Sequence, residues 1–369
     1  MKKSRKKIGI IDADLLDNGT RHPNLALMKI SGYYKAQGKE VELLMSYDNL
    51  DDYEQVYISK VFTFTNVPNL INNAKNVKVG GTGFFGSKAE DLPYEIEHHM
   101  PDYDLYIKYV DEQVEKGKNK RYFKDYLDYS IGFSTRGCFR KCTFCVNKKY
   151  NKVFRHSSIS EFYDPRRKYI YLWDDNFLGF SGWAEILDEV VKTGRYFQFR
   201  QGLDIRLLTE EKAIKLSQVK YHGDFIFAFD NVADKELISR KLELWRNHCK
   251  KTTKLYLFCA YESQDENDIE RIFIRLEVLM KFGCLPYLMR YEDYLGSKWE
   301  KLYITLARWM NQPQFYKMMS FKEFCERNQF YCKTDKTCSS MQSMIDFERE
   351  HPQIASRYFD LKFMDLHKY

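Results

Sequence analysis

The chain has 369 residues, 44% hydrophobic and 16% aromatic, which is enough apolar material for two domains or for one large domain with appendages. Its 59 basic and 52 acidic side chains leave a net charge of +7, so the composition permits an anionic partner without requiring one. No run of about 18 apolar residues occurs in the sequence, which excludes a transmembrane helix.

The first third of the chain alternates short apolar strands with one helix. We expect strands over residues 8–11, 40–44, 55–61 and 76–80, and a helix over residues 23–37 that ends at Gly38. This order predicts a small Rossmann-like α/β domain over residues 1–125. A charged, lysine-rich segment over residues 112–124 marks its end.

Strands and helices then alternate with an even spacing of about 30 residues. The expected strands begin near Ser130, Lys168, Tyr196, Asp224, Lys254 and Leu285. The clearest helix covers residues 268–280, where apolar residues fall on one face. Such near-continuous apolar strands predict a parallel sheet covered on both sides, open or curled into a partial barrel, over residues 126–310. A helix-rich extension follows over residues 311–369.

The strongest local signal is the CxxxCxxC run formed by Cys138, Cys142 and Cys145. Three thiolates on one short loop suit a [4Fe-4S] cluster that keeps one iron without a protein ligand. A structural zinc site would need a fourth ligand, and no matching pair follows at finger-like spacing. Disulfides would need an oxidising compartment, whereas the chain begins with lysines and no signal peptide, which indicates the cytoplasm.

This cysteine run resembles the signature of the radical S-adenosylmethionine (radical SAM) superfamily. The resemblance implies that the amino and carboxylate groups of SAM chelate the open iron and that reductive cleavage gives a 5′-deoxyadenosyl radical. It also favours a partial (β/α)6 barrel, with the cysteines directly after its first strand. Phe144 matches the aromatic residue that packs by the adenine in these enzymes.

Polar residues follow every expected strand of the barrel, where sites form in parallel α/β barrels. The resemblance gives the segment Trp173, Asp174, Asp175, Asn176 to the amino group of SAM. A carboxylate can accept both ribose hydroxyls, and an arginine can pair with a carboxylate. The further candidates for the ribose and methionine groups of SAM are Arg200, Asp230, Glu262 and Arg290.

The N-terminal domain resembles the cobalamin-binding domain that precedes the barrel in one subgroup of the superfamily. Ser59 and the pair Gly80 and Gly81 match the serine and the double glycine that accommodate the nucleotide tail of cobalamin. The DxHxxG loop of that subgroup, whose histidine can ligate cobalt, is absent after the first strand. Two alternatives stay open: a domain that retains cobalamin, and a degenerate domain reused for substrate or architecture.

Three further cysteines, Cys325, Cys332 and Cys338, lie in the C-terminal extension. They are candidates for an auxiliary cluster, but their spacing matches no specific motif, and cysteines are also common core residues.

Basic residues also follow the cysteine run, from Arg140 to Lys168, with Tyr150 and Phe154 between them. They suit a solvated loop face, a nucleic-acid surface, or a docking face for an acidic reductant such as flavodoxin or ferredoxin.

The sequence therefore predicts a cytoplasmic radical SAM enzyme that modifies an unknown substrate, which can be a peptide, a small molecule or a nucleic acid. One alternative is a cobalamin-dependent radical SAM methyltransferase. An alternative of another class is a non-catalytic iron-sulfur or zinc module that binds nucleic acid or protein.

Overall fold

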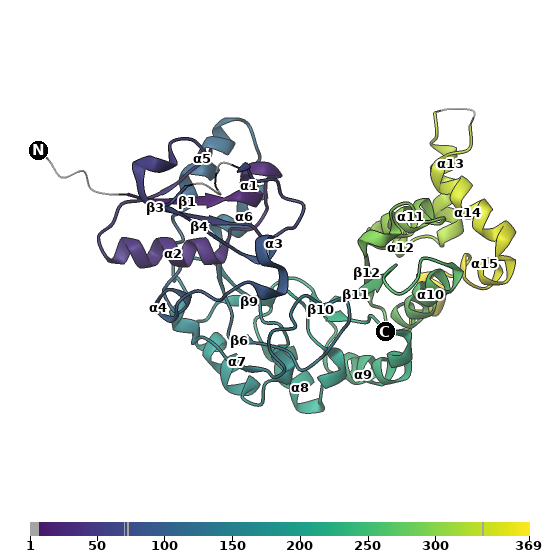
Figure 1. Cartoon of the computed structure of the whole chain (residues 1–369). Coiled ribbons are helices and arrows are strands. Elements are labelled where there is room, and N and C mark those ends of the chain that lie inside the picture. The colour runs from purple at the N-terminus through teal and green to yellow at the C-terminus, as the bar shows by residue number, and fades with distance from the viewer. Residues whose placement is uncertain (1–6, 70, 72–73, 334–335) are drawn as a thin grey trace, which may run out of the picture. The chain divides into compact units, whose positions relative to one another are not determined.

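The computed structural model describes residues 7–69, 71, 74–333 and 336–369, so the lysine-rich start of the chain lies outside the described residues. The chain forms two compact units, Met1–Arg200 and Gln201–Tyr369 (Figure 1). The division into three domains with boundaries at residues 125 and 310 stays a prediction.

The first unit begins with a four-stranded parallel sheet. Its strands lie in the order β2-β1-β3-β4. Their bounds are β1 (Lys7–Asp12), β2 (Val41–Leu43), β3 (Tyr53–Ser59) and β4 (Val77–Gly80). Each lies at or within two residues of its expected range, because short apolar runs bounded by glycine and polar residues predict strands well.

Apolar side chains cover both faces of this sheet, as expected for parallel strands. Ile8 and Ile10 of β1 pack with Met28 of helix α2 (Leu25–Ala36), which lies along the sheet in Figure 1. Ile11 belongs to a second core cluster with Val56 and other residues, because successive side chains of a strand point to opposite faces. Both faces of the sheet are therefore buried.

The charged segment at residues 112–124 is partly helical and packs on this domain. Helix α5 (Ile107–Glu115) buries Tyr109 and Val110, and Phe123 joins the same core cluster as Ile8. Its charges are the outer face of an amphipathic element. The remaining helices of this part are α1 (Ala13–Asp17), α3 (Thr82–Phe85), α4 (Tyr94–Glu97) and α6 (Lys124–Leu127).

A second parallel sheet of the first unit has the order β5-β8-β9. Its strands are β5 (Tyr129–Gly132), β8 (Tyr169–Leu172) and β9 (Tyr196–Phe199), and helix α7 (Trp183–Lys192) connects the last two. Beyond β5, the short strands β6 (Thr135–Arg136) and β7 (Phe154–Arg155) pair in antiparallel fashion. This two-stranded ribbon encloses the cysteine run.

The second unit holds a parallel sheet of order β10-β11-β12. Its strands are β10 (Phe225–Ala228), β11 (Thr253–Cys259) and β12 (Leu285–Arg290). Helix α8 (Glu210–Gln218) precedes β10, and helices α9 (Lys235–His248) and α10 (Glu266–Lys281) connect the three strands. Helix α10 buries the apolar face expected from the sequence, including Ile269, Ile272 and Leu276.

The C-terminal extension is helical, as expected. Its helices pack on α10, where the ring of Phe273 stacks on that of Tyr358 at 5.6 Å between centroids. The last helices of the chain are α11 (Glu300–Met310), α12 (Pro313–Tyr316), α13 (Phe321–Phe330), α14 (Ser339–Glu350), α15 (Pro352–Tyr358) and α16 (Phe363–Leu366).

The structure confirms an α/β fold with parallel sheets and all six strands expected after residue 126. Hydrogen bonds join these strands as two sheets of three, with an isolated bridge from Leu203 to Phe227. Their closure into one partial (β/α)6 barrel stays a prediction. Within the described ranges, no helix combines the length and the apolar composition that a membrane span requires.

Candidate functional site

The three cysteines of the CxxxCxxC run lie on a loop, residues 137–153, whose two ends are held together. Thr135 pairs with Arg155 and Arg136 with Phe154 in the ribbon beneath it. Gly137 opens the loop with a φ of +87°, and a Cβ atom there would lie 2.2 Å from the Lys152 carbonyl oxygen. Only glycine fits this close approach without strain. We call residues 137–153 the cysteine loop.

The thiols of the cysteine loop are half-buried, and no disulfide joins any of the nine cysteines, all of which lie in described residues. The Arg140 amide and the Asn176 side-chain amide each donate to Cys138 Sγ at 3.3 Å. The Asn147 amide donates to Cys145 Sγ at 3.4 Å. Amide donors to sulfur tune iron-sulfur clusters, so the donor set fits such a group.

No three His, Cys, Asp or Glu side chains in the described parts of the chain already stand together as a metal-binding group. Cluster binding at Cys138, Cys142 and Cys145 thus requires the cysteine loop to close its thiols on the iron atoms. Metal sites often form only as the metal binds. The assignment of these three ligands stays a prediction.

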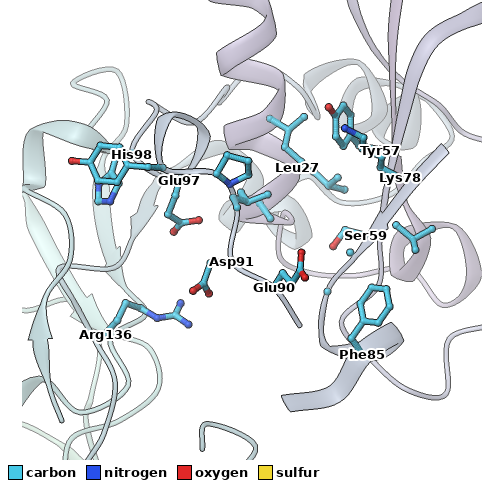
Figure 2. Close-up of a pocket in the computed structure, with 18 of the residues that line it drawn as sticks. Leu27, Tyr57, Ser59, Lys78, Phe85, Glu90, Asp91, Glu97, His98 and Arg136 are labelled. Atoms are coloured by element: carbon cyan, nitrogen blue, oxygen red, sulfur yellow. The ribbon is translucent and has the colours of Figure 1, made fainter. Parts of the chain in front are cut away.

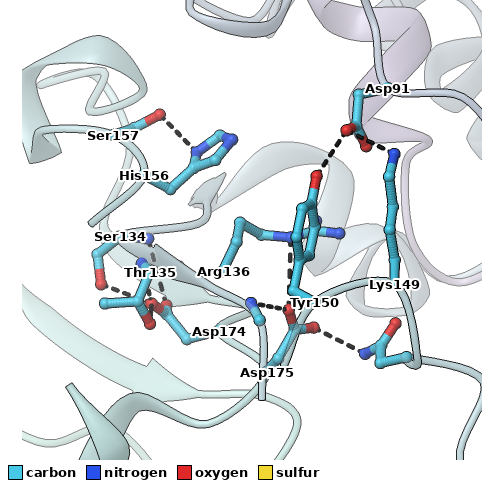
Figure 3. A network of polar contacts seen from close by, with 12 residues as sticks. Asp91, Ser134, Thr135, Arg136, Lys149, Tyr150, His156, Ser157, Asp174 and Asp175 are labelled. Carbon is cyan, nitrogen blue, oxygen red and sulfur yellow. Dashed lines mark hydrogen bonds and ion pairs between the residues drawn. The ribbon is translucent and has the colours of Figure 1, made fainter. Parts of the chain in front are cut away.

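Asp174, directly after β8, fixes the chain that leads into the cysteine loop. Its buried carboxylate accepts hydrogen bonds from the amides and hydroxyls of Ser134 and Thr135, including 2.7 Å from Ser134 Oγ and 2.6 Å from Thr135 Oγ1 (Figure 3). Burial raises the pKa of Asp174, and these hydrogen bonds oppose that rise. Asp174 therefore fixes the position of the backbone at Ser134 and Thr135.

Asp175 holds the cysteine loop at its start and at a point within it. Its carboxylate accepts from the Gly137 amide at 2.7 Å and from Asn147 Nδ2 at 2.7 Å. Arg136 Nε lies 3.4 Å from the same carboxylate (Figure 3). Two residues expected to contact SAM, Asp174 and Asp175, thus contact the segment that carries the cysteines.

Two polar atoms at the end of β8 are buried without a hydrogen-bond partner among the described residues: Asn176 Oδ1 and Trp173 Nε1. An orphaned buried acceptor costs free energy unless a ligand satisfies it. Asn176 also donates to Cys138 Sγ, so its free oxygen lies beside the cysteine loop. An ammonium group fits this acceptor, which is the group expected here from SAM. Phe144 lies half-buried in the cysteine loop.

Arg200, directly after β9, belongs to a different group of contacts. One terminal nitrogen of its guanidinium lies 3.1 Å from His22 Nε2, and its charge lies over the Tyr171 ring at 5.7 Å. His22 also pairs with Asp125 and packs edge-on against Trp173. This cluster connects the loop after β1 to the ends of β8 and β9.

A cavity of about 740 Å³ lies beside β3 and β4 (Figure 2). This volume falls within the range of about 300–1,000 Å³ typical of small-molecule and cofactor sites. Ser59, Gly80 and Gly81, the three residues expected at a nucleotide tail, all line it. An added Cβ on Gly80 would meet no atom within 4 Å, so this glycine faces open space. Asn24 Nδ2 donates to Ser59 Oγ at 2.9 Å.

One end of the cavity is charged. Buried Lys29 donates to Glu97 at 2.8 Å, and His156 Nε2 lies 3.3 Å from the same carboxylate. Burial lowers the pKa of Lys29, whereas hydrogen bonds from His156 and Lys29 outweigh burial and lower the pKa of Glu97 to about 2. His98 stacks on His156 at 5.0 Å and pairs through Nδ1 with Glu161 at 2.7 Å.

The cysteine loop also contacts the wall of this cavity. Asp91 accepts from Lys149 Nζ and from the Tyr150 hydroxyl, each at 2.6 Å (Figure 3). Arg136, two residues before Cys138, lines the cavity as well. No sequence pattern indicated Asp91, Glu97 and His98, because their segment lacks a regular periodicity.

The other SAM candidates lie in the second unit. Asp230 accepts from the Phe258 amide at 3.2 Å, and burial raises its pKa. Glu262 is exposed, and Arg290 ends β12 with its guanidinium over the Tyr294 ring at 4.4 Å. Asp230 and Arg290 therefore contact their own unit, and their roles toward SAM stay predictions.

The C-terminal cysteines do not form a metal-binding group among the described residues. Cys325 is fully buried in α13, and burial raises the pKa of its thiol far above the usual range. Cys332 and Cys338 are half-buried, and residues 334–335 between them lie outside the described part. The auxiliary cluster stays a prediction.

Many basic residues around the cysteine loop have acidic partners. Arg155 pairs with Glu189 at 2.6 Å, and Lys168 pairs with Asp128 at 3.0 Å. Lys149 pairs with Asp91. These contacts fit a solvated loop face, the first of the three interpretations of this basic segment.

Comparisons with known proteins find similarity at the level of structure and none at the level of sequence. No family model matches the sequence, and no curated protein matches it. The structure is similar to that of TsrM from Kitasatospora setae, a radical SAM methyltransferase, solved with cobalamin and a [4Fe-4S] cluster bound. That match has a TM-score of 0.53 and 12% identity over 77% of this chain and 75% of that one.

A second structure of TsrM, with tryptophan substrate and a SAM analogue bound, matches with a TM-score of 0.51. Identity is again 12%, over 77% of this chain and 73% of that one. At this identity the likeness shows the fold alone. The chain thus shares its overall fold with TsrM over 77% of its length.

Proposed function

We propose that this protein is a radical SAM enzyme that binds a [4Fe-4S] cluster, SAM and cobalamin and transfers a methyl group to a small molecule. Cys138, Cys142 and Cys145 would hold the cluster. Asn176 Oδ1 would accept a hydrogen bond from the SAM amino group, and Phe144 would pack by the adenine. When bound, the cluster would offer its open iron to SAM, and the proposed methyl transfer would take only the methyl group from SAM, so it would consume no 5′-deoxyadenosyl radical.

The observation that carries the cobalamin part of the proposal is the cavity itself. Ser59, Gly80 and Gly81 were expected at the nucleotide tail from the sequence, and all three line one cavity of cofactor size. A degenerate domain would have no reason to keep Gly80 facing open space. When bound, cobalamin supplies a cobalt centre that carries a methyl group.

The loop after β1 offers the cavity no histidine. His22, the histidine that ends this loop, contacts Asp125 and Arg200 and is not among the lining residues. We infer that cobalamin binds without a histidine from this loop. This feature also favours a second candidate, a radical SAM enzyme that has lost cobalamin and generates the 5′-deoxyadenosyl radical for another reaction.

The charged end of the cavity offers a side chain that can accept the proton released from the substrate. Methyl transfer gives S-adenosylhomocysteine from SAM, and the methyl group replaces a substrate hydrogen that leaves as a proton. Glu161 engages His98 Nδ1, which leaves His98 Nε2 available to accept a proton. The tryptophan bound by TsrM makes a small-molecule substrate our choice over a peptide or a nucleic acid. A reductant such as flavodoxin or ferredoxin would supply electrons.

Anaerobic reconstitution tests the proposal. Purified protein is loaded with iron, sulfide and hydroxocobalamin, desalted, and assayed for bound iron and bound cobalamin, with Cys142→Ala and Gly80→Val as matched variants. We expect about four iron atoms and one cobalamin per chain, loss of iron only in Cys142→Ala, and loss of cobalamin only in Gly80→Val. Incubation with SAM and dithionite then separates the classes of function.

Each outcome has a distinct meaning. Iron without cobalamin, together with 5′-deoxyadenosine, would favour the second candidate. A fully reconstituted protein that yields neither 5′-deoxyadenosine nor S-adenosylhomocysteine would contradict the enzyme proposal and favour a non-catalytic module. Bound zinc in place of iron would contradict the cluster assignment.

A further inference from the structure

The cavity beside β3 and β4 has two different ends (Figure 2). Ser59 and Phe85 lie at one end, where Gly80 leaves open space along the sheet. Arg136, together with Glu97 and His98, lies at the other end. Lys78 and Glu90 also line the cavity near Ser59, so the ends differ in the open space beside Gly80 rather than in charge, and this space suits a flat group of an elongated ligand.

The guanidinium of Arg136 is held in place by the protein. Its central carbon lies 4.1 Å from the centre of the Phe133 ring, and its Nε lies 3.4 Å from the Asp175 carboxylate. The side chain is 26% exposed, and Figure 2 shows it pointing into the cavity. A guanidinium stacked on a ring and paired through Nε presents its outer nitrogens as a fixed fork.

The outer nitrogens of this fork make no hydrogen bond to any described residue, which leaves their donors for a ligand. The nearby acids already have partners of their own. Glu97 is engaged by Lys29 and His156, and Asp91 accepts from Lys149 and Tyr150. Arg136 is therefore a preorganised cation that pairs with Asp175 through Nε and keeps its two outer nitrogens for a ligand.

We propose that Arg136 binds the phosphodiester of a nucleotide-bearing cofactor whose base occupies the Ser59 and Gly80 end of the cavity. This inference rests on the proposed function, in which that cofactor is cobalamin. A planar guanidinium donates two parallel hydrogen bonds to two phosphate oxygens, a geometry that lysine does not reproduce. The same contact joins cofactor binding to the segment that leads into Cys138.

The test compares two corrinoids on the full-length, reconstituted protein. Hydroxocobalamin carries the nucleotide and its phosphodiester, whereas dicyanocobinamide lacks both. We measure the Kd of each by equilibrium dialysis for the wild-type protein, Arg136→Gln and Arg136→Lys. The control is Arg155→Gln. Arg155 lies in the same ribbon as Arg136, but it pairs with Glu189 and does not line the cavity.

Arg136→Gln should weaken cobalamin binding about 10- to 100-fold, the loss expected for a charge-assisted contact, and leave cobinamide binding within about twofold. Arg136→Lys should recover only part of the affinity. Bound iron reports whether each variant retains its fold and its cysteine loop. Arg155→Gln should bind both corrinoids like the wild type.

Two results would overturn this inference and leave the proposed function intact. Equal losses of affinity for cobalamin and cobinamide would mean that Arg136 acts on the corrin ring or on the fold. Unchanged affinity for both corrinoids would mean that Arg136 binds neither. Wild-type protein that binds neither corrinoid would instead overturn the cobalamin part of the proposed function, and this inference with it. The failure of the inference is thus distinguishable from the failure of its foundation.

Discussion

The sheets β5-β8-β9 and β10-β11-β12 are both parallel and three-stranded, yet their strand ends are held in opposite ways. In the first sheet, the buried carboxylate of Asp174 accepts hydrogen bonds from the two residues that lead into the cysteine loop. In the second sheet, the buried guanidinium of Arg275 donates to the carbonyl oxygens of Phe229, Asp230, Phe258 and Arg271.

This difference separates strand ends that leave buried polar atoms unsatisfied from strand ends whose carbonyl groups one side chain satisfies. Around Asp174, the polar atoms Asn176 Oδ1 and Trp173 Nε1 stay unsatisfied among the described residues. Around Arg275, one side chain satisfies several carbonyl groups of neighbouring strand ends. The proposed function uses the first arrangement for ligand binding, whereas the second is satisfied within the protein.

The largest expected effect tests whether only the first region binds metal. Cys142→Ser should reduce bound iron from about four atoms per chain to nearly none after reconstitution, because three thiolates are the minimum for the proposed cluster. The control is Cys259→Ala in β11, where burial raises the pKa of the thiol to about 12 and disfavours the thiolate. Equal iron loss in both variants would contradict the assignment.

A second test removes the buried guanidinium of Arg275 beside the sheet β10-β11-β12. Arg275→Met should lower the free energy of unfolding by about 3–5 kcal/mol, because it leaves buried acceptors and the partner Asp268 uncompensated. Urea denaturation measures the change. Arg271→Met, a more exposed arginine of the same helix, should cost less than about 1 kcal/mol. Bound iron should stay unchanged in Arg275→Met, and a loss of iron would break the comparison.

The corresponding change in the first region should affect both stability and iron. Asp174→Asn replaces an acceptor with a donor facing the amides and hydroxyls of Ser134 and Thr135, so we expect a loss of about 3 kcal/mol. Iron release to a chelator should also accelerate. Glu189→Gln, which weakens a partly exposed pair with Arg155 and keeps an oxygen for the Ile159 amide, is the control. Unchanged iron release would show that Asp174 acts only on stability.

Asp12, at the end of β1, sharpens the comparison because its buried carboxylate has fewer donors. Burial raises its pKa to about 6 despite hydrogen bonds from Tyr106 and Leu15. Since this pKa is higher in the folded than in the unfolded state, the folded state binds the proton more tightly. Stability should therefore fall by about 2–3 kcal/mol as pH rises from about 4 to about 6.

The Asp12→Asn variant isolates this titration. The asparagine cannot ionise, so the difference in unfolding free energy between the variant and the wild type should change with pH across this window. Chemical denaturation at a series of pH values measures it. A constant difference from pH 4 to pH 6 would contradict the shifted pKa of Asp12.

The sequence was sufficient for features that depend on local pattern. Alternating or continuous apolar residues located β1, β11 and the other main strands, and the spacing of Cys138, Cys142 and Cys145 identified the cysteine loop. The pattern was weaker where an amphipathic helix carries many charges, as in α5.

Long-range contacts could not be predicted in the same way. His98 stacks on His156, 58 residues further along the chain, and no local periodicity encodes such a pair. The direction of the Arg136 guanidinium depends on Phe133 and on Asp175, which follows a different strand. Asp174 and Asp175 were expected to contact SAM, whereas in the structure they contact the segment that leads into and carries the cysteines, a role that composition alone does not reveal.

The closed base of the cysteine loop has a consequence for biosynthesis. Because the ribbon and the Gly137–Lys152 contact fix both ends of the loop, the thiols lie on a surface lasso outside the hydrophobic core. If the proposed cluster binds there, iron and sulfide would be installed after the polypeptide has folded. The same opening would permit repair after damage by oxygen without unfolding of the chain.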